Sequence, residues 1–157
     1  RKMALFKPPS LASLAHSYAN AKFEAPALFK AVGAEAVAKI QVFEPNDLGR
    51  IVCAFAKAGF PAPLMFDAVQ QQVPKLLKQF QSKDVENLLW AYSTSGFKAP
   101  ALFDAVANDS LDRVATFAPQ QLAGTAVAFV KARHKSTALF EAIASEALAR
   151  LDASTAA

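Results

Sequence analysis

Aromatic and other apolar positions recur along this chain every 37 residues, without insertions. The step is exact for three columns of aromatic residues: Phe6, Phe43, Phe80 and Phe117; Tyr18, Phe55, Tyr92 and Phe129; Phe29, Phe66, Phe103 and Phe140. A constant period of this length is typical of a repeat architecture. We therefore expect one array of four units, numbered one to four, over residues 6–42, 43–79, 80–116 and 117–153.

Each unit contains two stretches with helical periodicity. In unit three, apolar residues at i, i+3, i+4 and i+7 share one helix face: Val85, Leu88, Leu89 and Tyr92. Prolines suited to a first helical turn mark the starts of the first helices at Pro8, Pro45 and Pro119, with Ser82 in unit three. The second helices are predicted to start at Pro26, Pro63, Pro100 and Thr137. The fold class predicted is all-α, an α-solenoid of about four helix-turn-helix repeats.

Six positions add detail to this regular pattern. Gly59 and Gly96 fit left-handed C-terminal caps of the first helices, whereas Lys22 and Arg133 should make less ideal turns. Ser136 is expected to cap the second helix of unit four through its side chain. Pro74 lies inside the second helix of unit two, and we expect it to kink or end that helix.

Composition narrows the class of protein. The chain has 157 residues, 54% of them hydrophobic, which suits a folded array. No apolar run reaches the roughly 18 residues of a membrane span, so we expect no membrane insertion. Cys53, the lone cysteine, excludes an internal disulfide framework and is expected in the core. Residues 1–5 and 154–157 flank the array, which lacks evident polar end caps, so we expect a longer protein.

The most regular units resemble a known family. Leu88-Leu89-Trp90-Ala91-Tyr92, Gly96-Phe97 and the segment 99–105 are similar to octotricopeptide and heptatricopeptide repeats. The resemblance implies helical hairpins of 37–38 residues in proteins of the mitochondrion or chloroplast that bind RNA and support its stability, processing or translation. Unit four departs most, with Arg133, His134 and Thr137 replacing the usual residues. The RAP domain often found in such proteins is not visible.

Candidate contact residues are polar first-helix positions that vary between units. Stacked hairpins commonly line their concave side with first helices, and offsets of i, i+4 and i+11 share one face. Amides can read base edges and cations can neutralise phosphates of single-stranded RNA. The residues predicted to bind RNA are Asn46, Arg50, Lys57, Lys83, Asn87, Thr94, Gln120 and Lys131. An ordinary solvated face would show the same composition, so this alternative stays open.

Two further features have structural explanations that compete with RNA binding. Trp90 could stack on a base, but packing against small neighbours is the favoured interpretation. A basic group near the ends of the second helices suits the helix dipole, although it could hold phosphates: Lys39, Lys75, Lys78, Arg113 and Arg150.

The sequence offers little for catalysis. Its two histidines are far apart, and it has no Gly-rich phosphate loop and no metal-ligand spacing. We therefore expect no enzyme activity, no cofactor, no metal and no small-molecule substrate. The first hypothesis is an organellar protein that grips single-stranded or ribosomal RNA on its concave face. The alternative is a structural scaffold subunit of a large organellar ribonucleoprotein or membrane complex, acting through protein contacts. The modest formal net charge of +4, the small number of units and the lack of evident end caps favour the scaffold more than the resemblance does, but RNA binding ranks first.

Overall fold

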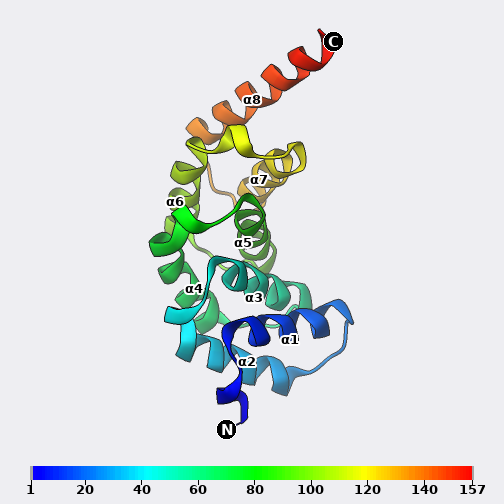
Figure 1. Cartoon of the computed structure of the whole chain (residues 1–157), viewed down its shortest axis with the longest axis vertical. Helices are drawn as coiled ribbons and strands as arrows, with labels where there is room; N and C mark the ends of the chain where they lie inside the picture. The colour runs from blue at the N-terminus through cyan, green and yellow to red at the C-terminus, as the bar shows by residue number, and fades with distance from the viewer. Residues whose placement is uncertain (1, 157) are drawn as a thin grey trace.

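The chain forms an all-helical array. A computed structural model describes residues 2–156, and within that range it contains eight α-helices and no strand (Figure 1). The α-helices are α1 (Pro8–Asn20), α2 (Pro26–Lys39), α3 (Pro45–Ala58), α4 (Pro63–Leu76), α5 (Ser82–Ser95), α6 (Pro100–Leu111), α7 (Pro119–Lys131) and α8 (Thr137–Thr155). Short 3₁₀ helices are η1 (Lys2–Leu5), η2 (Ile40–Val42), η3 (Leu77–Gln79) and η4 (Val114–Thr116).

The starts of all eight α-helices agree with the repeated prolines and their replacements, as predicted. A proline in the first turn loses no helical hydrogen bond, because the first amides of a helix have no partner within it. The predicted cap at Ser136 is wrong in its detail. Ser136 stands at the N-cap of α8, but its side chain makes no capping hydrogen bond. Its backbone carbonyl instead accepts the Phe140 N–H at 3.0 Å.

The turns after the first helices use left-handed backbone conformations. Gly59 and Gly96 have φ values of 66° and 73°, which glycine adopts without steric cost. Lys22 and Arg133 occupy the same positions in the outer units with φ values of 52° and 54°. A side chain at positive φ is strained, so the less ideal outer turns are confirmed.

Of the two effects expected of Pro74, a kink or an end of α4, the end is wrong. Helix α4 continues to Leu76, one repeat period after the end of α2 at Lys39. Pro74 is exposed and lies near the end of α4, so the loss of one amide donor does not stop the helix there.

The helices form two layers. The first helices of the units (α1, α3, α5 and α7) pack side by side, and the second helices (α2, α4, α6 and α8) form the other layer (Figure 1). Consecutive first helices approach one another more closely than second helices do, which makes the first-helix layer the inner side of the curve. At Gly49 an added Cβ would lie 3.2 Å from the Asp84 carbonyl oxygen, so α3 and α5 depend on glycine for their approach. The predicted α-solenoid is confirmed.

Aromatic side chains join each unit to the next. Phe66 of α4 packs edge-on against Tyr92 of α5, with ring centroids 5.1 Å apart, and stacks on Phe97 at 5.7 Å. The Tyr92 hydroxyl also donates a 2.5 Å hydrogen bond to the Phe66 carbonyl oxygen. Phe29 repeats this packing with Phe55 and Phe60 at the preceding junction. The aromatic columns are therefore the core that stacks the units. No helix within residues 2–156 is both long and apolar enough to cross a membrane.

Candidate functional site

The predicted contact residues lie at three levels along the first-helix layer. Asn46, Lys83 and Gln120 are exposed in the opening turns of α3, α5 and α7. One turn further on, Arg50 and Asn87 are half-buried. The exposed residues Lys57, Thr94 and Lys131 lie at or close to the C-terminal ends of the same three helices. We call this set of eight residues the inner surface.

Hydrogen bonds connect equivalent positions of neighbouring units across the inner surface. Arg50 donates to the Ser13 hydroxyl at 3.3 Å, and the Lys57 ammonium donates to the Asn20 amide oxygen at 2.5 Å. Lys131 donates to the Thr94 hydroxyl at 3.3 Å. Lysine has three donors and arginine five, so donors remain for a ligand. These hydrogen bonds thus hold the cations in register from unit to unit, and each cation keeps N–H donors for a ligand.

The neighbouring titratable groups sense this positive charge. Burial, assisted by the charges of Arg50 and Lys57, lowers the pKa of His16 below its ordinary value. Burial raises the pKa of the Cys53 thiol, against an opposing influence of Lys57. Cys53, which was expected in the core, is half-buried in α3. The lowered pKa of His16 favours its neutral form beside the cations.

The inner surface is less basic toward unit four. The Glu86 carboxylate oxygen lies 3.8 Å from the position that a Cβ on Gly124 would occupy. It therefore places an acid between α5 and α7. Among the first helices, α3 carries two cations of the inner surface, Arg50 and Lys57, which are two turns apart.

Trp90 does not pack in the interior as expected. Its side chain is 39% exposed on α5, in the same column as the exposed residue Val127 of α7. Both residues are exposed on their first helices. An indole with this exposure can offer part of one ring face to a base.

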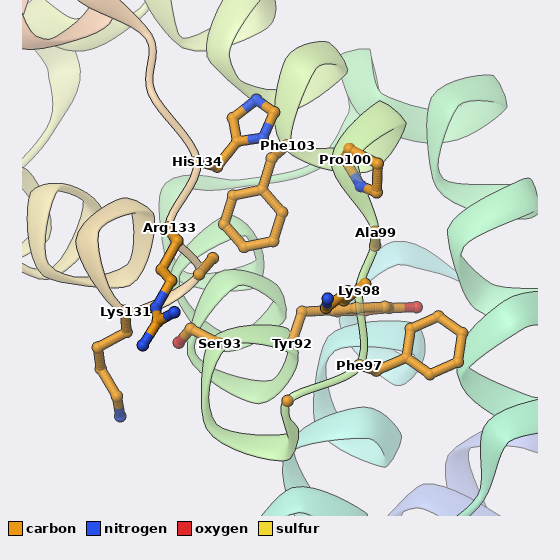
Figure 2. Close-up of a pocket in the computed structure, with 12 residues that line it drawn as sticks. Tyr92, Ser93, Phe97, Lys98, Ala99, Pro100, Phe103, Lys131, Arg133 and His134 are labelled. Carbon is orange, nitrogen blue, oxygen red and sulfur yellow. The ribbon is translucent and has the colours of Figure 1, made fainter.

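A hollow repeats at each junction between units. The three hollows have volumes of about 350, 450 and 480 Å³ from the first junction to the third, and equivalent residues line them. Each is bounded by a turn, by the start of a second helix and by the end of the following first helix. Figure 2 shows the third, with Lys131 and Arg133 on one side of Tyr92 and Phe103, and Lys98 on the segment before α6. Lys57, Thr94 and Lys131 are the inner-surface residues that line these hollows.

Three cations of the second-helix group have a structural role that sequence reasoning missed. Lys39 and Arg150 each donate to a carbonyl oxygen 33 residues earlier, those of Phe6 and Phe117, at 2.7 Å. Arg113 does the same to the Phe80 carbonyl oxygen. Each cation also pairs with an acid one turn before it: Lys39 with Glu35 at 2.9 Å, Arg113 with Asp109 at 2.6 Å and Arg150 with Glu146 at 2.7 Å. We call each such arrangement a clasp.

Unit two has no clasp, because Gln72 and Leu76 replace the acid and the cation. A sequence signal for the clasp was therefore present, as an acid and a cation that are lost together in one unit. The two remaining cations of the group are also engaged. Lys78 pairs with Asp109 at 3.1 Å, and Lys75 donates to Gln72 at 3.3 Å. The cations of this group thus take part in packing between and within units, and phosphate binding by them remains a prediction.

No cluster of three or more metal-ligating side chains occurs in the part of the chain that the structure describes. His134 instead contacts Asp104, with Nε2 2.7 Å from a carboxylate oxygen. It also packs against Phe103 and Phe129, with ring centroids 5.6 and 5.8 Å away. His134 thus takes the place of Phe60 and Phe97 in the aromatic packing.

Fold and surface together define a helical-repeat protein with a polar and cationic inner side. Comparison with protein families gives a match over residues 1–157 to the model of RESC6, the RNA-editing substrate-binding complex 6 protein. The chain therefore belongs to the RESC6 family, which is a family of RNA-associated helical proteins from an RNA-editing complex. No curated protein matches the chain.

Proposed function

We propose that the chain binds single-stranded RNA along its inner surface, as a non-catalytic component of an RNA-editing complex. The observation that carries the proposal is the register of Arg50, Lys57 and Lys131 with amide side chains on successive first helices. Family membership supports RNA as the ligand. The resemblance to octotricopeptide repeats and a location in the mitochondrion belong to the same proposal.

In this proposal, the cations provide affinity for RNA and the amide side chains provide preference between sequences. Cations that neutralise phosphates release counterions, which gives affinity for any strand and makes that affinity fall with salt. Asn46, Asn87 and Gln120 can donate to and accept from base edges, which gives preference between sequences. Four units offer a short path of a few nucleotides. Stable association with RNA is therefore expected to depend on other members of the complex as well.

The inner surface can be tested by removing its charge. In a variant with Arg50→Gln, Lys57→Gln and Lys131→Gln, affinity for a fluorescent single-stranded RNA should fall by about tenfold or more at about 100 mM salt. Fluorescence anisotropy of the full chain measures this affinity. Glutamine keeps a polar side chain of similar length, so the hydrogen bonds to Ser13 and Asn20 can be kept in part.

A matched variant distinguishes local contacts from net charge. Lys2→Gln, Lys30→Gln and Lys75→Gln remove the same number of charges from exposed positions outside the inner surface. This variant should lose much less affinity. Equal losses in both variants would show that only the net charge matters, and would contradict the proposed surface.

A second function, as a scaffold, is supported by exposed apolar residues on α8. In α2, α4 and α6, the apolar columns equivalent to Phe140 and Ile143 are 0–3% exposed, whereas both residues are half-buried in α8. Leu151 is 63% exposed, while Ile40 and Leu77 at the same position in the units are 8% and 7% exposed. This side of α8 could pack against a protein subunit. If the purified chain binds RNA, the scaffold function would accompany RNA binding. If the purified chain binds no RNA, the scaffold function would stand alone.

A further inference from the structure

The three junction hollows share one geometry but differ in charge. The first is lined by Lys22, Glu24 and Lys57, which give a formal charge of +1. The second has no charged residue in its lining. The third is lined by Lys98, Lys131 and Arg133, which give +3. Because the shape repeats, charge is the property that singles out the third hollow.

Three cations line the third hollow, and the Lys131 ammonium also donates to Thr94 at 3.3 Å. Figure 2 shows Lys131 and Arg133 at the end of α7 and in the turn after it, and Lys98 on the segment that leads into α6. Lys98 and Arg133 are exposed and make no side-chain hydrogen bond or ion pair within residues 2–156. The start of α6 also borders the opening through Ala99 and Pro100, and the N-terminal end of a helix favours anions. A negatively charged group at this hollow would therefore have cations on both sides of it and a helix N-terminus at its border.

Arg133 has a left-handed backbone conformation that it shares with Lys22, the residue at the same position in unit one. Arg133 has a φ of 54°, where Gly59 and Gly96 stand in the inner units. Open space surrounds the equivalent glycines, so a side chain at this position extends away from the packed core. Residues in strained backbone conformations often have a functional role. Arg133 combines such a conformation with a positive charge at the hollow.

We propose that the third hollow binds the phosphate backbone of single-stranded RNA, with Lys98, Lys131 and Arg133 as its contacts. This inference rests on the proposed function and adds a phosphate contact to it. It adds Lys98 and Arg133 to the inner surface, which Lys131 already reaches. The backbone would thus pass from the inner surface of α5 and α7 into the turn region of units three and four.

The test uses a substitution that removes charge and suits the backbone. In the full chain, Arg133→Gly places glycine at a positive φ, as in the inner units, and Lys98→Gln changes an exposed residue. The double variant should bind fluorescent single-stranded RNA about tenfold more weakly at about 100 mM salt. The slope of log affinity against log salt should become shallower by about 1–2. Its melting temperature should not fall, because glycine relieves the strained turn.

A control variant makes the same kinds of change at the other end of the array. Lys22→Gly also replaces a cation at a positive φ, and Lys30→Gln removes a second exposed charge. This variant should stay within about twofold of the wild type. Equal loss in the two double variants would overturn the third hollow while leaving RNA binding in place. Absence of RNA binding by the wild-type chain would instead overturn the proposed function and, with it, this inference.

Discussion

Replacing Phe66 by alanine should lower the free energy of unfolding by about 3–5 kcal/mol. Phe66 is 2% exposed and fills the junction between units two and three. Its removal leaves a cavity between α4 and α5 and ends the aromatic contacts with Tyr92 and Phe97. Repeat arrays depend on the interfaces between neighbours, so unfolding should also become less cooperative. Urea unfolding followed by circular dichroism measures both effects.

Phe140 provides a control within the same chain. It holds the equivalent position in α8 but is only half-buried, with no following unit in the described residues to cover it. Alanine at this position should therefore cost less than half as much as at Phe66. Equal losses at the two positions would show that the stacking of units does not depend on the aromatic junctions.

Replacing Arg113 by leucine should lower the free energy of unfolding by about 3 kcal/mol. Arg113 pairs with Asp109, whose side chain is 4% exposed, and binds the Phe80 carbonyl oxygen. Without the guanidinium, the buried carboxylate retains only Lys78 at 3.1 Å, and the carbonyl loses its donor. A buried carboxylate left with a single, largely exposed cation as its partner is the main part of the expected cost. Denaturant unfolding of the purified variant gives the value.

Unit two suggests a second substitution that should restore the stability lost in Arg113→Leu. It holds Gln72 and Leu76 where unit three holds Asp109 and Arg113. The double variant Asp109→Gln/Arg113→Leu copies that neutral pair into unit three, so it should recover most of the stability lost in Arg113→Leu. A double variant that is less stable than the single variant would contradict the role assigned to the clasp.

The period of the sequence was sufficient to predict the fold because each unit repeats nearly the same pattern of prolines, turn residues and aromatic residues. First-turn prolines gave the helix starts, and Gly59 and Gly96 gave left-handed turns. The aromatic columns predicted the stacking core, since equivalent residues of successive units must meet in an array. The division into the units 6–42, 43–79, 80–116 and 117–153 remains a prediction.

The errors arose where the outcome depended on tertiary neighbours. The effect of Pro74 was overestimated because the remaining hydrogen bonds and packing of α4 are not visible in its own residues. Trp90 was expected to be packed, but burial is decided by which column the neighbouring layer covers. The clasp of Arg113 reaches 33 residues back, beyond any helical spacing. The eight predicted inner-surface residues lie in one layer, that of the first helices, and their contact with RNA remains a prediction.

Cross-linking tests the central claim most directly. The purified chain is irradiated with a single-stranded RNA that contains 4-thiouridine, and the linked peptides are identified by mass spectrometry. We predict that links fall on α3, α5 and α7 and on the turn around Arg133, and that they diminish at high salt. Links confined to α2, α4 and α6 would place the RNA on the opposite layer and contradict binding by the inner surface.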